Sequence, residues 1–527
     1  MKTQPNSSAI PETNPVKDAT PKDAAAVILL RKAKPHEQST NSREIAEQIF
    51  WVRRSERLSF LGGFYAFPGG QRDETDAATP VANAPDAEAC AMIACAAREL
   101  FEELGVLVAR GAETLTKGQR ASLLDDLTSS RMTFPELLSH YDLHLDARDF
   151  TFTGRWVTPP FSPRRFDTWF FLVECPIKQE PYVVEGELES GEWTSAAGAY
   201  ARWQRSEVLC APPVLHALHT LAGGLTDDLI ARFLSVPQAH GEPVRRIEFR
   251  PGFICFPLRT PTKPPATHTN CYIIGGRDLT IIDPASPDEG EQKALAACID
   301  DLLAEGRNVH AIILTHLHPD HIGGANALIN HLKKRGISVP VAAHHLTAEA
   351  LRDFVKVERF IEDDETIELE GEPHLALRAL HTPGHARGHL CFYEERTGAL
   401  VTGDMIVGLG SVLIDPPEGN MCDYLNSLER LRALPHLTVL FGAHGPAIGS
   451  ARAKIDEYIN HCLEREANIL KAVREGSITV EEIRDRVYMD VHPKAYEMAA
   501  RAVLAHLEKL VADKLLIRND DGHYMAR

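Results

Sequence analysis

The segment Thr315 to His321, which reads THLHPDH, constrains the fold of this chain more than any other stretch. It follows the apolar run Ala311 to Leu314, which predicts a buried strand. Imidazole and carboxylate groups are side chains that bind transition metals. A close H-x-H pair and an adjacent D-H pair point in different directions, so the segment predicts two metal ions rather than one. Its candidate ligands are His316, His318, Asp320 and His321.

Three further ligand-type residues each lie at the end of another apolar segment. His385 ends LRALHTPGH, Asp404 ends GALVTGD, and His444 lies in TVLFGAHGP. Histidines scattered through a histidine-rich chain would not all follow predicted strands, so the pattern favours a dinuclear metal site. Nearby histidines are interpreted as hydrogen-bonded support or packing and not as ligands. These are His344, His345, His381 and His389.

With these residues the chain resembles the metallo-beta-lactamase superfamily. The resemblance implies two zinc ions, the first held by His316, His318 and His385, the second by Asp320, His321 and His444, with Asp404 bridging them. It also implies that Asp283, at the end of LTIID, braces the H-x-H-x-D-H loop. Zinc would lower the pKa of a water molecule, and Asp320 would be the catalytic residue that orients this nucleophile.

The composition narrows the partners and the compartment. There are 56 Lys and Arg residues against 74 Asp and Glu, a net charge of −18, so the surface as a whole repels polyanions and double-stranded DNA is not expected as a partner. The 10 cysteines form no C-x-x-C pair, which favours free thiols in a reducing compartment. No apolar run approaches the length of a membrane span, so no membrane association is expected, and a cytoplasmic location is predicted.

The length predicts several domains. Residues 1–23 are expected to form a disordered polar tail, 24–237 a first α/β domain, 238–450 the domain with the metal ligands and 451–527 a helical domain. The first junction, SVPQAHGEPVRR, contains two prolines and a glycine, as linkers often do. Residues 24–237 are therefore expected to fold when expressed alone.

The informative run in the first domain is RELFEELGV, from Arg98 to Val106. Its apolar residues recur at helical spacing, which predicts an amphipathic helix. Glu99, Glu102 and Glu103 share the opposite side, where their carboxylates would repel one another unless a hard divalent cation lies between them. The alternative is a solvated acidic helix face.

Together with FYAFPGG, from Phe64 to Gly70, this run resembles the Nudix box of hydrolases that cleave nucleoside diphosphates linked to another moiety. The resemblance implies that Glu99, Glu102 and Glu103 bind Mg²⁺ or Mn²⁺, that Glu99 and Glu103 are catalytic, and that Arg98 orients a glutamate. The spacing between Gly70 and Arg98 is longer than in the family box, and Cys90 replaces an earlier glutamate. Such an insertion is similar to that of the coenzyme A diphosphatase subgroup, and the inserted segment 71–89 is expected to loop outward. The alternative is a retained fold with a recognition role.

The C-terminal segment predicts three helices followed by a short hairpin around an Asp-Gly turn, a winged-helix pattern. It resembles the small domain of the beta-lactamase-like protein 2 group. Its mixture of acidic and basic residues offers no basic recognition helix, so a packing or dimerisation module is expected, with a homodimer left open. The expected fold is an α/β multidomain chain with a Nudix α/β/α sandwich, a metallo-beta-lactamase αββα sandwich and a small winged-helix domain.

Two function classes stay open. The first is a metal-dependent hydrolase of an ester, thioester or phosphodiester in a small molecule, with a Nudix domain that cleaves a nucleoside diphosphate derivative such as coenzyme A. The second is a single-stranded RNA endoribonuclease with a non-catalytic nucleotide- or RNA-binding Nudix module. A closed pocket favours the first, and a basic groove leading to the metals favours the second.

Overall fold

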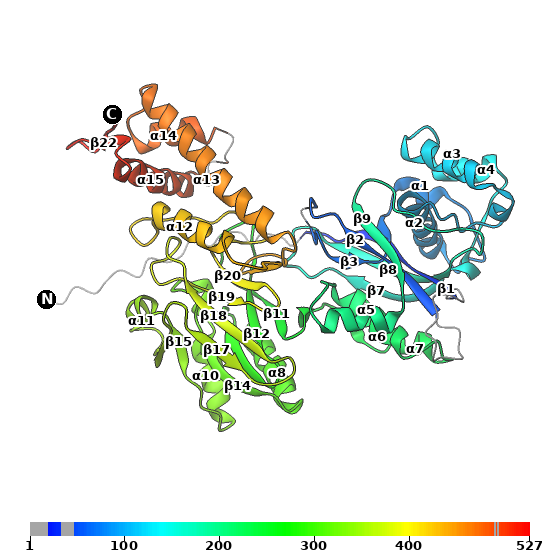
Figure 1. The fold of residues 1–527 in the computed structure, drawn as a ribbon, viewed down its shortest axis with the longest axis horizontal. Helices are drawn as coiled ribbons and strands as arrows, with labels where there is room; N and C mark the ends of the chain where they lie inside the picture. The colour runs from blue at the N-terminus through cyan, green and yellow to red at the C-terminus, as the bar shows by residue number, and fades with distance from the viewer. Residues whose placement is uncertain (1–18, 33–46, 59, 490–491, 493–494) are drawn as a thin grey trace.

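The computed structural model describes residues 19–32, 47–58, 60–489, 492 and 495–527. Along the chain they form an N-terminal α/β part, a central part with two stacked sheets and a C-terminal helical part (Figure 1). Most of the polar tail expected at residues 1–23 lies outside the described residues, and the first strand begins at Lys22. In the part of the chain that the structure describes, no helix is both long and apolar enough to traverse a bilayer.

The N-terminal part is built on a seven-stranded sheet of order β3-β2-β1-β8-β7, with β4 beside β1 and β9 beside β2. β1 runs parallel to β8, and its successive residues Val27 and Ile28 are buried in different hydrophobic cores, as expected for a strand covered on both faces. The strands of this sheet are β1 (Lys22–Lys32), β2 (Glu47–Arg54), β3 (Tyr65–Ala66), β4 (Gly69–Gln71), β7 (Thr151–Val157), β8 (Phe166–Glu174) and β9 (Leu188–Thr194). The short strands β5 (Val81–Ala82) and β6 (Leu145–Asp146) form a separate pair.

Helices cover both faces of this sheet. One face is packed by α2 (Ala87–Leu104), whose apolar stripe includes Leu100, Phe101 and Leu104. Asp86 caps its first turn by accepting a hydrogen bond from the Ala89 amide at 2.8 Å, and Gly105 ends it in the left-handed region, with φ 65°. The other helices of this part are α1 (Glu74–Ala78), α3 (Lys117–Thr128), α4 (Phe134–His140), α5 (Ala196–Gln204), α6 (Pro212–Ala222) and α7 (Leu229–Phe233).

The inserted segment 71–89 does not loop outward, so that expectation is wrong. It contains α1, and Asp76 on this helix is fully buried. The physical reason is an ion pair with Arg98, whose Nε and Nη2 donate to the two carboxylate oxygens of Asp76 at 2.9 Å each. A buried guanidinium requires such a partner, and the insertion supplies it.

The central part is an αββα sandwich. One sheet has the order β10-β11-β12-β13-β14-β15-β16 and the other β17-β18-β19-β20-β21. The first consists of β10 (Ile247–Arg250), β11 (Phe253–Arg259), β12 (His268–Ile274), β13 (Asp278–Ile282), β14 (Asn308–Ile313), β15 (Val341–Ala343) and β16 (Arg359–Phe360). The second consists of β17 (Thr366–Leu369), β18 (Leu375–His381), β19 (Leu390–Glu394), β20 (Ala399–Gly403) and β21 (Val439–Gly442).

Helices pack on the outer faces of both sheets of the sandwich (Figure 1). They are α8 (Glu289–Ala304), α9 (Pro319–Ile322), α10 (Ala325–Lys334) and α11 (His345–Leu351) after strands of the first sheet, and α12 (Met421–Arg432) after the second. The C-terminal part contains α13 (Ala451–Arg474), α14 (Val480–Val487), α15 (Tyr496–Ala512) and the hairpin β22 (Leu516–Arg518) and β23 (Tyr524–Ala526). These elements enclose a small core of their own.

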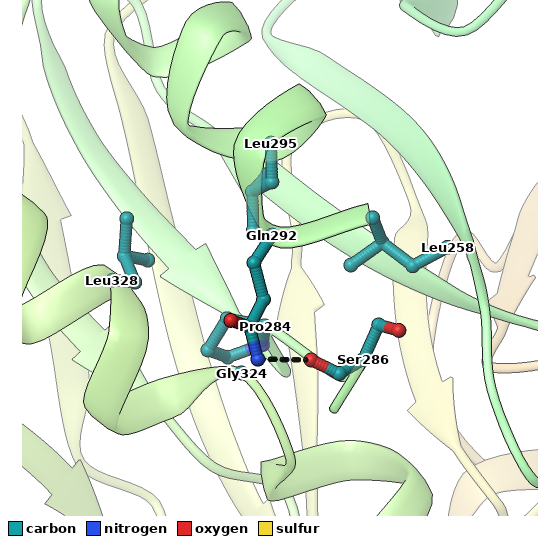
Figure 2. Close-up of a pocket in the computed structure, with 7 residues that line it drawn as sticks. All are labelled: Leu258, Pro284, Ser286, Gln292, Leu295, Gly324 and Leu328. Atoms are coloured by element: carbon teal, nitrogen blue, oxygen red, sulfur yellow. Dashed lines mark hydrogen bonds between the residues drawn. The ribbon is translucent and has the colours of Figure 1, made fainter. Parts of the chain in front are cut away.

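A pocket of about 10 Å³ lies beneath α8, where Gln292 donates a hydrogen bond to the Ser286 carbonyl at 3.0 Å (Figure 2). This is room for one water molecule and not for a ligand. Gly324 closes the pocket, because a Cβ there would lie 2.3 Å from the Pro284 carbonyl oxygen. The packing holds the segment that follows Asp283 against α10.

The hydrophobic core of the N-terminal part continues into the central part. One cluster of buried side chains runs from Ala26 to Phe249 and on between the two sheets of the sandwich to Phe441. Phe64 meets Phe249 edge to face at 5.6 Å, and Trp203 Nε1 donates to the Phe249 carbonyl at 3.1 Å. The expected boundary between residues 237 and 238 therefore falls close to contacts that both parts share, and the boundaries stay a prediction.

We expect a fragment of residues 19–237 to fold but to unfold at lower urea concentration than the full chain. It loses Ile247 and Phe249, and covering apolar side chains of this size contributes about 2 kcal/mol each. Tryptophan fluorescence gives a direct comparison, because all 5 tryptophans of the chain lie before residue 204. Equal midpoints in the two proteins would show that the shared core adds no stability to the N-terminal part.

Candidate metal centre

The candidate metal ligands of the central domain lie where β14, β18, β20 and β21 end. Because β14 belongs to one sheet and the other three strands to the second, the stacking of the sheets brings all seven side chains together. Their donor atoms form two groups, and within each group the atoms lie within 4.8 Å of one another. The groups are His316, His318, His385 and Asp404, and Asp320, His321 and His444.

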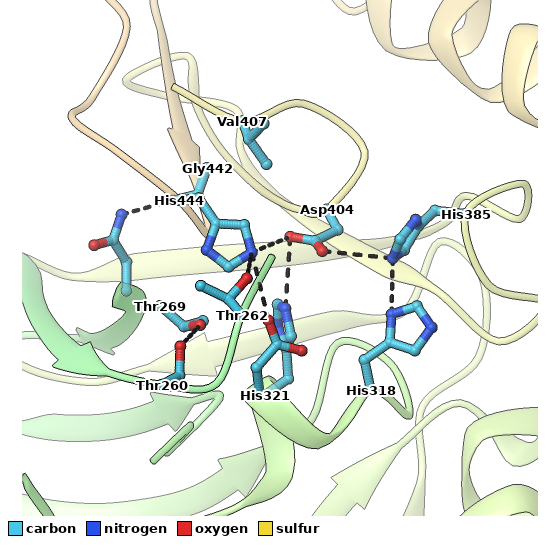
Figure 3. Close-up of polar contacts among 12 residues, drawn as sticks. Thr260, Thr262, Thr269, His318, His321, His385, Asp404, Val407, Gly442 and His444 are labelled. Atoms are coloured by element: carbon cyan, nitrogen blue, oxygen red, sulfur yellow. Dashed lines mark hydrogen bonds and ion pairs between the residues drawn. The ribbon is translucent and has the colours of Figure 1, made fainter. Parts of the chain in front are cut away.

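Asp404 lies between the two groups. Figure 3 shows His385 and His318 on one side of its carboxylate and His444 and His321 on the other. Oδ2 of Asp404 is 3.4 Å from His385 Nε2, while Oδ1 is 3.3 Å from His444 Nε2 and 3.5 Å from His321 Nε2. Each carboxylate oxygen thus faces a different group, which is the geometry of a bridging ligand.

Three imidazoles converge in the first group. Nδ1 of His318 lies 2.9 Å from His316 Nε2 and 2.9 Å from His385 Nε2. In the second group, His444 Nε2 is 3.7 Å from Asp320 Oδ2. His321 Nε2 and Asp404 Oδ1 are buried and have no hydrogen-bond partner among the described residues. Buried polar atoms without partners are costly, and a divalent cation would satisfy both.

The outward-facing nitrogen of four imidazoles is held by a hydrogen bond. Nδ1 of His316 lies 2.9 Å from Thr315 Oγ1, and Nδ1 of His321 lies 2.8 Å from Asp283 Oδ2. His385 Nδ1 bonds to the Leu413 carbonyl at 2.9 Å, and His444 Nδ1 to the His268 carbonyl at 2.8 Å. Such bonds select the tautomer and leave Nε2 free toward the centre, which is the usual support of metal-binding histidines.

Asp283 fixes the loop of His316 to His321 through hydrogen bonds to Thr315 and His321. Besides His321, its carboxylate accepts hydrogen bonds from the Thr315 amide at 2.8 Å and the Thr315 hydroxyl at 2.6 Å. Its backbone is in the left-handed region, with φ 52°, which is uncommon for a residue other than glycine. A strained backbone at this position is maintained by three hydrogen bonds to the loop.

The electrostatics keep the imidazoles of the first group in the neutral form that binds metal. Burial, followed by the neighbouring His385, lowers the pKa of His318 to about 3, and burial also holds the pKa of His316 well below its usual range. Burial opposes ionisation of Asp404, but His444 and His321 lower the pKa of its carboxyl well below the usual range. In the second group, against the opposing effect of burial, Asp404 raises the pKa of His321 and of His444, so a cation bound there would have to replace protons on these imidazoles.

The C-terminal domain holds the segment between Asp404 and α12. Tyr458 on α13 bonds to both backbone groups of Val407, with distances of 3.3 Å to the amide and 3.1 Å to the carbonyl. Arg501 on α15 donates to the Asp415 carboxylate and to the Pro416 carbonyl. Since the Leu413 carbonyl between these points orients His385, the third domain takes part in positioning a candidate ligand.

The glutamates expected to bind Mg²⁺ or Mn²⁺ lie on α2 and line one cavity with the glycines Gly69 and Gly70. Glu103 accepts a hydrogen bond from the Gly69 amide at 2.8 Å. A Cβ on Gly70 would lie 2.6 Å from the Glu99 carboxylate, so only glycine allows this approach. Glu102 turns toward Arg98, whose Nη1 donates to Glu99 and Glu102 at 2.9 Å each.

Burial leaves two of these carboxyls poorly ionised. It raises the pKa of Glu99 to about 7 and the pKa of Glu103 to about 8, the latter with a contribution from Glu99. Arg98 lowers the pKa of Glu99 only in part. Two adjacent buried carboxyls without a full countercharge fit a divalent cation, which would replace the missing positive charge.

Some functional groups had no signal in the sequence. Asp76 holds Arg98 from within the insertion, and no motif marks it. The carbonyls of Leu413 and His268 orient candidate ligands, but every residue has a carbonyl, so the sequence cannot distinguish them.

His389, interpreted from the sequence as support, is fully buried and accepts a hydrogen bond from the Asp404 amide at 3.1 Å.

A two-sheet sandwich with this cluster at its strand ends defines a metal-dependent hydrolase class. Three family models match the chain: the metallo-beta-lactamase superfamily at residues 264–444, the NUDT19 Nudix domain at 81–221 and the beta-lactamase associated winged helix domain at 479–524. The chain belongs to the metallo-beta-lactamase superfamily, with an additional Nudix domain before the hydrolase domain and a winged-helix domain after it. The cluster fits a divalent metal site.

Relatives and solved structures cover different parts of the chain. The beta-lactamase-like protein 2 homolog of Caenorhabditis elegans is 30% identical over 46% of this chain and 79% of that protein. The atrochrysone carboxyl ACP thioesterase of Aspergillus chevalieri is 31% identical over 45% of this chain and 75% of that protein. A NUDIX hydrolase structure from Alicyclobacillus acidocaldarius is 29% identical, covers 42% of this chain and 98% of that chain, and has a TM-score of 0.33.

Replacing Arg501 should weaken metal binding at a distance. Arg501→Met removes the hydrogen bonds to Asp415 and Pro416, so the Leu413 carbonyl loses its fixed position behind His385. We expect the metal dissociation constant to rise about 10-fold, as for other losses of ligand support. Chelator competition measures it, with Arg474→Met on the exposed end of α13 as a matched control. Equal affinity in both variants would contradict the positioning role.

Proposed function

We propose that the central domain hydrolyses a thioester or related ester with two zinc ions. The observation that carries this proposal is Asp404, whose two carboxylate oxygens face separate groups of histidine nitrogens. One ion would be held by His316, His318 and His385, the other by Asp320, His321 and His444, with Asp404 shared. Zinc is favoured because the donors are mostly imidazole nitrogens with carboxylate oxygens.

The zinc ions would supply Lewis acidity, which lowers the pKa of water toward about 7 and polarises the bond to be cleaved. Asp320, half-buried beside His444, would accept a hydrogen bond from the attacking water and orient it toward the substrate. Asp283 would keep the imidazole of His321 in one orientation. No serine or cysteine nucleophile is needed in this scheme.

The thioester is favoured as substrate because a relative of this domain is named a thioesterase. A polyanionic RNA is disfavoured by the net charge of −18. A rate comparison of the full chain on acyl-coenzyme A and on single-stranded RNA separates the two classes. Cleavage of RNA alone would reverse the choice and support a ribonuclease with a nucleotide-binding Nudix module.

We infer a second activity for the Nudix domain, the cleavage of a nucleoside diphosphate derivative such as coenzyme A. The position of Glu99 and Glu103 beside Gly70 and Gly69 in one cavity supports it. Burial raises the pKa of these carboxyls to about 7 and about 8, and a divalent cation would favour their ionised forms. Mg²⁺ or Mn²⁺ would be held by Glu99, Glu102 and Glu103, with Arg98 orienting Glu99 and Glu102. Glu99 or Glu103 would accept the proton of the attacking water.

Removing the shared carboxylate should abolish the central activity. Asp404→Ala deletes the oxygen atoms that face both groups, so we expect bound zinc to fall below one ion per chain and thioester hydrolysis to fall by at least ~100-fold. Metal content by mass spectrometry and turnover are measured together. Asp353→Ala is the control, since its side chain is 83% exposed on the same domain. Near-normal turnover in Asp404→Ala would exclude a shared ligand.

Glu103→Gln should remove Nudix activity without affecting the zinc-dependent reaction. The substitution deletes one carboxylate that faces Gly69, so hydrolysis of coenzyme A with Mg²⁺ should fall by at least ~100-fold, a loss typical of general acid–base groups. Glu88→Gln on the exposed start of α2 is the matched control. In the wild type, Mg²⁺ should bind more tightly as pH rises from 6 to 9, since the protons held by Glu99 and Glu103 leave over this range. If the wild type hydrolyses no diphosphate, the Nudix activity is contradicted and the domain would have only a binding role.

A further inference from the structure

The cavity that the Nudix glutamates line is shared by two domains. Its volume is about 790 Å³, in the upper part of the range for small-molecule sites. Its wall includes Val244, Ile247 and Phe249 from the start of the central domain, and Pro446, which follows the candidate ligand His444 by two positions. A molecule that fills this cavity would therefore touch both the Nudix and the metallo-beta-lactamase domain.

One part of the cavity wall suits a phosphate group. Arg54 lies in this wall, and its Nε atom is buried without a hydrogen-bond partner among the described residues. Burial lowers the pKa of Arg54, and Glu187 and then Glu103 act in the opposite direction. The Nη2 of Arg54 faces Glu187 at 3.8 Å, and its Nε–H is left for another acceptor. A phosphate oxygen could bind this N–H and also a cation held by the glutamates.

Another part of the wall is apolar. It is formed by the aromatic residues Trp156, Phe166 and Phe170 of β7 and β8 together with Val244, Ile247 and Phe249. Ile247 and Phe249 belong to the hydrophobic cluster on the face of the N-terminal sheet opposite to α2. The apolar part is thus separate from the glutamates, and a compact polar diphosphate would not cover it.

Contacts between the N-terminal and the central domain hold this apolar wall in a fixed position. Phe249 is fastened by the Trp203 hydrogen bond at 3.1 Å and by its edge-to-face contact with Phe64. Nearby, Gly449 lies so close to the N-terminal domain that a Cβ on it would be 2.4 Å from the Gly62 carbonyl oxygen. A preformed wall binds without the entropy loss of ordering it, so these side chains can discriminate between ligands.

We propose that this cavity binds a diphosphate ester that carries an apolar chain, and that the metallo-beta-lactamase domain selects the chain through Val244, Ile247 and Phe249. The inference rests on the proposed Nudix function for the diphosphate end. It assigns the specificity of one domain to residues of the other. The ligand would place its diphosphate near Arg54 and the glutamates and its chain against β10.

Alkyl thioethers of coenzyme A test the proposal, because they have no thioester bond for the central domain to cleave. Binding of coenzyme A and of its S-butyl and S-octyl thioethers is measured by calorimetry on the full chain without added Mg²⁺. Affinity should rise with chain length, by up to about fourfold for each buried methylene. Val244→Phe, in the irregular segment before β10, fills part of the apolar space and should reduce the gain from butyl to octyl at least 10-fold.

Val339→Phe, at a valine of the central domain outside the cavity, is the control for the added side-chain volume, and it should keep the chain-length dependence. If Val244→Phe also keeps it, or if wild-type affinity does not depend on chain length, the proposal is overturned. If Val244→Phe fails to fold, the proposal is tested on the wild type by measuring hydrogen exchange of the β10 backbone amides with each compound bound. Slower exchange with the S-octyl thioether than with coenzyme A supports the proposal, and equal exchange overturns it.

The same experiment separates this inference from the Nudix activity. In one outcome, affinity depends on chain length, Val244→Phe reduces this dependence, and no diphosphate is hydrolysed with Mg²⁺. This result would support the proposed ligand site and contradict the Nudix activity. In another outcome, the protein hydrolyses coenzyme A but its affinity for the thioethers does not depend on chain length. This result would support the Nudix activity and contradict the selection of the chain by the central domain. Absence of binding by all three compounds would overturn this inference, and absence of coenzyme A hydrolysis with Mg²⁺ would overturn the Nudix activity.

Discussion

The buried carboxylate of Asp404 is the constraint on which the central domain depends. A charge removed from water is strongly destabilising unless charged or polar groups surround it. The nitrogens of His321, His385 and His444 approach Asp404 from different strand ends, and each imidazole is held from behind by a carbonyl or by Asp283. In this chain the groups come from the strand ends of two sheets, so they surround the carboxylate only when the sheets are stacked. The αββα sandwich does this, and the winged-helix domain completes it through Tyr458 and Arg501.

The parts of the molecule that could be predicted from the sequence are those with a repeated local pattern. An apolar strand followed by a histidine or aspartate occurs at Asp283, His316, His385, Asp404 and His444, and the strands that the pattern predicts are present. The helix of RELFEELGV could be predicted because its apolar residues recur at helical spacing. In the C-terminal domain the three expected helices are present, and Thr479 and Glu482 form a capping box at the start of α14.

The parts that could not be predicted depend on contacts between distant segments. The insertion before α2 has no apolar repeat that marks its position, and only the buried charge of Arg98 explains why Asp76 is drawn inward. The cavity wall combines strands β7 and β8 with β10, which lies beyond a segment of linker-like composition. Composition identifies such a segment as a junction, but it carries no information on whether the flanking domains pack closely or remain apart.

The continuous core also determines the order in which the chain can mature during synthesis. The N-terminal sheet is complete once β9 has emerged, yet the apolar face that Phe249 covers is still open. Phe249 can meet Phe64 and Trp203 as it emerges, but the core around it stays incomplete, because the neighbouring Phe253 stacks on Phe441 at 5.3 Å, near the end of the second sheet. At about 5–20 residues per second, roughly ten seconds or more separate these events. During that interval the nascent chain presents an unfinished hydrophobic surface, at which chaperones or misassembly can act.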